Sequence, residues 1–115
     1  MSEIDKFGKV FIEETRDLSI NNMNKKLYGQ IKNEEGKELH NKFDGFTDEQ
    51  KNVIKNIVSK TVDTVIDNFL FMIEQHDEIA LLYNDVNLNE ASDGLSGELY
   101  TEDGWIQKYS SLFSD

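Results

Sequence analysis

The chain has no cysteine and no proline in its 115 residues. Without cysteine it can form neither a disulfide framework nor a thiolate metal site, and it has no cysteine nucleophile. The absence of proline favours long helices over a sandwich of short strands. No apolar run approaches the ~20 residues of a membrane span, and the chain does not start with the basic and apolar segments of a secretory signal. We therefore expect a cytoplasmic protein in which residues 1–115 form one domain.

Basic residues are also missing from residues 61–107, where eleven carboxylates occur. Residues 1–60 carry eleven acidic and eleven basic residues, so the net charge of −11 arises after residue 60. Such a surface repels nucleic acid phosphates and anionic lipids, and it attracts basic proteins. We expect no nucleic acid or membrane partner and a possible basic protein partner. The sequence makes no prediction of oligomeric state.

The stretch from Thr47 to His76 predicts one long central helix around which the chain is organised. Thr47 and Gln50 have the spacing of a capping box, in which each side chain bonds the backbone of the other residue. Apolar residues then recur every three or four positions and predict one buried face. The run from Phe69 to Ile73 is apolar all round, so we expect it to be covered on more than one side. The predicted cover is a short final helix with a shared face of Trp105, Tyr109, Leu112 and Phe113.

The other segments complete a mainly α fold. A first helix begins at Ser2, with a predicted interruption at Asn21 and Asn22, and a short helical stripe precedes the long helix. After the long helix, the run 79–83 could pair as a β-hairpin with a strand from Leu88 and 95–100, with turns at Asp93-Gly94 and Ser96-Gly97, or the region could form an irregular loop. Arg16, the single arginine, is expected to bond Glu13 locally, and the alternative is a bidentate bond to a buried carboxylate.

The long helix also carries a possible metal site. Asp63, Asp67 and Glu74 fall on one narrow strip, and His76 follows near the helix end. Helical bundles build metal sites from such inward carboxylates, but they also use a Glu-x-x-His spacing that is absent here. Solvated carboxylates are the simpler interpretation. The pattern indicates no catalytic residue and no cofactor.

The segment from Ser92 to Trp105 combines glycines, carboxylates and two aromatic residues, which is typical of a shaped loop. The candidate partner-binding residues are Asp93, Glu98, Tyr100, Glu102, Asp103 and Trp105. In residues 92–110 and 63–74 the chain resembles a family of small uncharacterised bacterial proteins. The resemblance implies a bacterial cytosolic origin, and it brings neither an activity nor functional residues.

Two hypotheses about function follow from these patterns. The first is a non-enzymatic, acidic protein-interaction module that binds a basic partner, as a toxin-neutralising immunity protein or a regulatory adaptor does. The alternative is a metal-binding protein or metal-dependent enzyme that uses the helix-borne cluster of Asp63, Asp67, Glu74 and His76. The interaction module is the preferred hypothesis, because the charge asymmetry is the strongest signal in the sequence.

Overall fold

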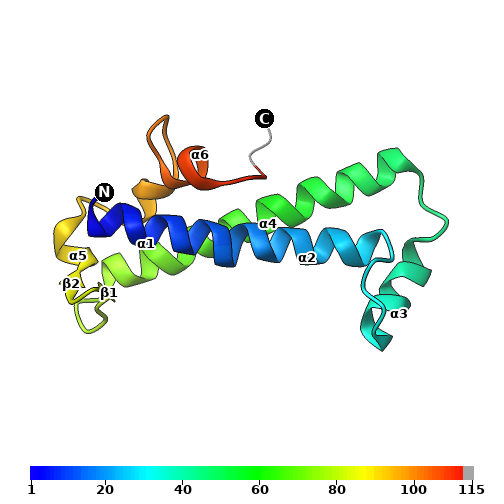
Figure 1. The fold of residues 1–115 in the computed structure, drawn as a ribbon, viewed down its shortest axis with the longest axis horizontal. Coiled ribbons are helices and arrows are strands. Elements are labelled where there is room, and N and C mark those ends of the chain that lie inside the picture. The colour runs from blue at the N-terminus through cyan, green and yellow to red at the C-terminus, as the bar shows by residue number, and fades with distance from the viewer. Residues whose placement is uncertain (113–115) are drawn as a thin grey trace.

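The protein is built on two long helical rods that lie side by side, with a short helix at one end and a small cap at the other (Figure 1). The structure, a computed structural model, describes residues 1–112. Its extents are 49 × 29 × 23 Å, and its radius of gyration is 16.6 Å. A compact domain of this length has a radius of gyration of about 13 Å. The fold is mainly α, as predicted. Its larger radius of gyration shows that the molecule is elongated.

The first rod consists of α1 (Glu3–Phe11), a π-helical segment η1 (Ile12–Asp17) and α2 (Leu18–Leu27). Ser2 caps it as predicted, because its Oγ accepts a hydrogen bond from the amide of Asp5 at 3.1 Å. The interruption expected at Asn21 and Asn22 is wrong, since α2 runs through both residues. The irregular part is η1, a type of wide turn that occurs often at functional sites.

The second rod is α4 (Asp48–Gln75), a helix of 28 residues that α3 (Glu34–Phe43) precedes. The predicted capping box is confirmed. The Gln50 amide donates to Thr47 Oγ1 at 3.1 Å, and the Thr47 amide donates to Gln50 Oε1 at 2.8 Å. The long central helix therefore begins where the local sequence places it.

The burial of α4 differs from the prediction. Leu70 and Ile73 are buried, but Phe71 and Met72 are exposed, so the expectation that the 69–73 run is covered on more than one side is wrong. Within the described residues, the elements that pack most closely against α4 are α2 and η1 of the first rod and η2 of the cap. One side of the helix is therefore left without a partner.

The cap begins with a small antiparallel hairpin of β1 (Leu82–Tyr83) and β2 (Val86–Asn87). Asn84 and Asp85 form its two-residue turn with φ values of +49° and +65°, as a type I′ turn requires. The hairpin exists, but its predicted second strand at 95–100 is wrong. The helix α5 (Leu88–Ala91) follows β2, and the chain from Ser96 to Leu99 forms the 3-10 helix η2.

The main core lies where the first rod, the second half of α4 and the cap meet. The final helix α6 (Trp105–Tyr109) brings Trp105 into this core with 1% exposure. Its indole packs edge-on against the rings of Phe7 and Phe11, with centroids 5.8 and 6.4 Å away. Phe113, which the sequence placed on the same face as Trp105, lies outside the described residues. No helix within residues 1–112 combines the length and the apolar character needed to cross a membrane.

Candidate functional site

The most unusual group inside the protein is the guanidinium of Arg16, on the π-helical segment η1. Its side chain is only 5% exposed. Nε donates to Asp63 Oδ1 at 2.6 Å, and Nη2 donates to Asp63 Oδ2 at 3.3 Å. The local bond to Glu13 is therefore wrong. The alternative of a bidentate bond is confirmed, except that its carboxylate is half-buried rather than buried, since the Asp63 side chain is 27% exposed. Glu13 bonds Lys9 instead, at 2.9 Å.

Asp17 extends this network to Ser110 and Ser111, which follow α6. Its Oδ1 accepts from Arg16 Nη1 and from the Ser110 hydroxyl, both at 2.8 Å, and its Oδ2 accepts from the Ser111 amide at 2.8 Å. The π-helical turn buries both Arg16 and Asp17 although they are consecutive. The network thus joins the first rod to α4 and to the segment after α6.

The charge of Arg16 is stabilised by its partners. Burial alone lowers the pKa of Arg16, but the hydrogen bonds and negative charges of Asp63 and Asp17 outweigh burial, and the net pKa is raised. Arg16 is therefore a fixed cation whose charge two carboxylates already balance.

A hollow of about 430 Å³ opens beside this network. Leu99 and Ile106, which are both buried, form apolar parts of its wall. Thr101 lies at its edge with a φ of +81°, an outlier for a β-branched residue. Strained backbone of this kind gathers at binding and active sites. The residues that line the hollow are Arg16, Asp63, Leu99, Tyr100, Thr101, Glu102, Ile106 and Gln107.

Tyr100 connects the hollow to a further carboxylate on α4. Its hydroxyl donates to Asp67 Oδ2 at 3.3 Å. Burial raises the pKa of Tyr100, and the negative charges of Asp67 and Asp63 raise it further. The hydroxyl therefore remains a donor at neutral pH, while its ring, in a side chain with 43% exposure, is open to a partner.

The predicted partner-binding residues divide into four groups. Tyr100 and Glu102 line the hollow. Asp93 and Asp103 are exposed elsewhere on the cap, and Glu98 accepts a hydrogen bond from the Ser92 hydroxyl at 2.8 Å. Trp105 is buried, so its assignment as a partner contact is corrected: the indole is part of the hydrophobic core.

The four candidate metal ligands do not converge. Asp63 bonds Arg16, Asp67 accepts from Tyr100, and Glu74 accepts from the Ser96 amide. His76 is exposed at the end of α4 with its Nδ1 3.2 Å from Glu78. Within residues 1–112, no group of three or more acidic or histidine side chains is placed to hold a metal ion. Glu74 instead anchors η2 to the long helix.

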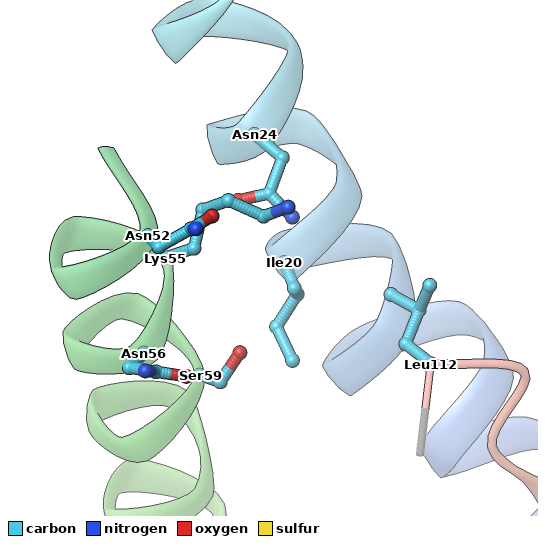
Figure 2. Close-up of a pocket in the computed structure, with 7 residues that line it drawn as sticks. All are labelled: Ile20, Asn24, Asn52, Lys55, Asn56, Ser59 and Leu112. Atoms are coloured by element: carbon cyan, nitrogen blue, oxygen red, sulfur yellow. The ribbon is translucent and has the colours of Figure 1, made fainter. Parts of the chain in front are cut away.

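A second hollow, of about 500 Å³, lies between α2 and the first half of α4. Figure 2 shows Ile20 and Asn24 on α2 facing a row of polar side chains on α4: Asn52, Lys55, Asn56 and Ser59. In the described part of the chain, Asn24 Oδ1 is buried without a hydrogen-bond partner. This hollow is larger, but Lys55 is its one charged lining residue. The hollow beside Arg16 brings together charge, an apolar wall and strained backbone, so we take it as the candidate site.

Comparisons of the chain with protein-family models, with curated proteins and with solved structures found no match. The site therefore has to be interpreted from its own geometry. Sequence analysis assigned Tyr100, Glu102 and Asp63 to candidate sites but did not bring them together. It missed Asp17 and Thr101 altogether. The available signal was Arg16, the single arginine in the protein.

Proposed function

We propose that the protein is an acidic protein-interaction module that binds a lysine or arginine side chain of a basic partner in the hollow beside Tyr100. The observation that carries the proposal is the charge of this region. Asp67 and Glu102 lie beside Tyr100, and the positive charge of Arg16 is already balanced by Asp63 and Asp17. The surroundings of the hollow therefore remain negative.

The shape of the hollow supports the same partner. Leu99 and Ile106 give its wall an apolar part of low dielectric, which strengthens the field of the nearby carboxylates. The exposed ring of Tyr100 offers a face over which a cationic group can lie. An apolar wall suits the stem of a lysine or arginine side chain, whose charged head then meets Glu102 at the edge.

The wider surface supports attraction over a distance. Residues 61–107 hold eleven carboxylates and no basic residue, so a basic protein is steered toward this end of the molecule. An immunity protein that neutralises a basic toxin and a regulatory adaptor both work in this way. A bacterial, cytoplasmic setting fits either role.

The test measures the affinity of the full chain for a fluorescent oligo-arginine peptide by anisotropy, at low and at raised salt. We expect Glu102→Gln combined with Asp67→Asn to weaken binding about tenfold, because Glu102 lines the hollow and Asp67 accepts the hydrogen bond of Tyr100 beside it. Glu34→Gln combined with Asp44→Asn is the matched control, since it removes the same charge from exposed positions at the α3 end.

The matched control separates a defined site from a general effect of net charge. If the two double variants weaken binding equally, the peptide responds only to net charge and the proposed site is wrong. The absence of binding at low salt would also overturn the proposal.

A further inference from the structure

Three aspartates in the chain are followed directly by glycine: Asp44, Asp93 and Asp103. A pair of this kind can rearrange without an enzyme, when the backbone nitrogen of the glycine attacks the side-chain carboxyl carbon of the aspartate. Glycine has no Cβ that would hinder this approach, and its backbone rotates more freely than that of other residues. The structure distinguishes the three pairs, because the surroundings of their glycine amides differ.

The pair Asp44–Gly45 lies in the link between α3 and α4, and both residues are exposed. In the part of the chain that the structure describes, the amide of Gly45 donates no hydrogen bond. A Cβ placed on Gly45 would meet no atom within 4 Å. The nitrogen of Gly45 is therefore neither bonded nor covered.

The other two glycine amides are held in place. The Gly94 amide donates to the Ser92 hydroxyl at 3.1 Å. The Gly104 amide donates to the carbonyl of Thr101 at 3.1 Å, and Gly104 is buried. A Cβ on Gly104 would overlap the carbonyl of Tyr100, so the backbone is closely packed there. At both pairs a hydrogen bond must break before the glycine nitrogen can attack.

We propose that Asp44 is a site of spontaneous modification, at which the folded protein converts this aspartate into isoaspartate. In the first step a bond forms between the Gly45 nitrogen and the carboxyl carbon of Asp44. The amide proton and the hydroxyl of the protonated carboxyl group leave as water, and a five-membered succinimide ring results. In the second step one water opens the ring. Attack at the former side-chain carbonyl restores aspartate, whereas attack at the backbone carbonyl of residue 44 gives isoaspartate.

Ring closure requires a rotation of the backbone at Asp44. This residue follows α3 and still has helical angles, with a φ of −56° and a ψ of −36°. The Gly45 nitrogen approaches the carboxyl carbon when the Cα–C bond of Asp44 rotates. The Phe46 amide bonds the Phe43 carbonyl across the pair at 2.9 Å, and the two rings are in contact. Phe46 is 39% exposed, however, and a surface turn at a helix end opens at small cost.

The conversion would change the link between the two helices. In isoaspartate the main chain runs through the former side chain, which adds one methylene to the backbone, while the negative charge is kept on the former backbone carboxyl group. The site lies at the α3 end of the rods, opposite the cap, so the proposal is independent of the binding hollow (Figure 1). An asparagine at this position forms the same ring with loss of ammonia, so Asp44→Asn is used freshly prepared in binding measurements.

The test follows the full chain by peptide mapping during prolonged warm incubation at mildly acidic pH. Trypsin cuts after Lys42 and Lys51, so Asp44 lies in the short peptide 43–51, whereas the other two pairs lie in peptide 61–108. The isoaspartate peptide has the mass of its parent but elutes separately, and fragmentation locates the residue. The protease Asp-N cuts before aspartate but not before isoaspartate, which reports on positions 93 and 103. We expect conversion at Asp44 to be about tenfold faster than at those positions, because a hydrogen bond protects each of their glycine amides.

Two controls separate the effect of the structure from that of the local sequence. In guanidinium chloride the protecting hydrogen bonds are lost, so all three pairs should convert at similar rates. Gly45→Ala should abolish the isoaspartate at residue 44 and leave the helical circular dichroism spectrum unchanged, because the φ of Gly45 is not positive and its Cβ meets no atom. Equal rates at the three pairs in the folded protein, or no isoaspartate at residue 44, would overturn the proposal.

Discussion

Arg16 and Asp63 form a bidentate ion pair across 47 positions of the chain, with Nε to Oδ1 at 2.6 Å and Nη2 to Oδ2 at 3.3 Å. This pair fixes the lateral position of the first rod against α4. It does so at the boundary between the charge-balanced half of the sequence and the acidic half. Both residues also line the candidate binding hollow, so this contact helps to position its wall.

Removing the guanidinium should strongly destabilise the fold. We expect Arg16→Ala to lower the free energy of unfolding by about 3–5 kcal/mol, because Asp17 would remain buried without its cation. Urea denaturation followed by circular dichroism measures the change. Lys9→Ala, which breaks the exposed pair with Glu13, is the control and should have little effect. Similar urea midpoints for the two variants would show that the buried network contributes no more to stability than an exposed ion pair does.

Gly8 should not tolerate a side chain. A Cβ at this position would overlap the indole of Trp105. We expect Gly8→Ala to cost about 1–3 kcal/mol through overpacking. Because Trp105 is the single tryptophan, its fluorescence should shift to the red as the cap loosens. Gly45→Ala is a suitable control, since a Cβ there meets no atom within 4 Å. An unshifted emission spectrum in Gly8→Ala would mean that the cap does not depend on this close approach.

Tyr100 should ionise at a higher pH than an ordinary tyrosine. Burial and the charges of Asp67 and Asp63 raise its pKa in the folded state, so the folded protein holds this proton more tightly than the unfolded chain. Stability should therefore fall as the pH rises above the ordinary tyrosine pKa of about 10. Asp67→Asn should lower the pKa of Tyr100, and ultraviolet titration of phenolate absorbance measures it. Tyr83→Phe removes the absorbance of one other tyrosine and should leave the Tyr100 transition in place.

Relief of the strain at Thr101 should stabilise the protein. A β-branched residue with a φ of +81° stores strain that glycine avoids. We expect Thr101→Gly to raise the free energy of unfolding by about 1 kcal/mol, after the greater freedom of glycine in the unfolded chain is subtracted. Thermal denaturation shows whether the variant is more or less stable than the unmodified protein. If Thr101→Gly also weakens the binding of the oligo-arginine peptide, the strained backbone helps to shape the hollow that binds it. A destabilised glycine variant would show that the Thr101 side chain contributes more than its backbone costs.

Much of the helical framework could be predicted because its signals are local. The Thr47 cap acts over three residues, and Ser2 acts in the same way, so their hydrogen bonds depend on neighbouring sequence alone. The hairpin was harder to place. A two-residue turn at Asn84 and Asp85 needs positive φ at both positions, and asparagine and aspartate adopt positive φ more readily than other residues with a side chain do. The predicted turns lay instead at Gly94 and Gly97, which put the second strand too far along the chain.

The sequence by itself determined the mainly α fold, the start of α4 and the concentration of negative charge after residue 60. Periodicity, capping and composition fix these, since each acts between residues that are close along the chain. Only the tertiary structure decided that Arg16 bonds Asp63 rather than Glu13, and that Ile57 and Val65 face outward. A periodic apolar pattern shows which residues share a face, but burial depends on how many neighbours the fold supplies. Here the first rod and the small cap cover one side of α4 and leave the other open.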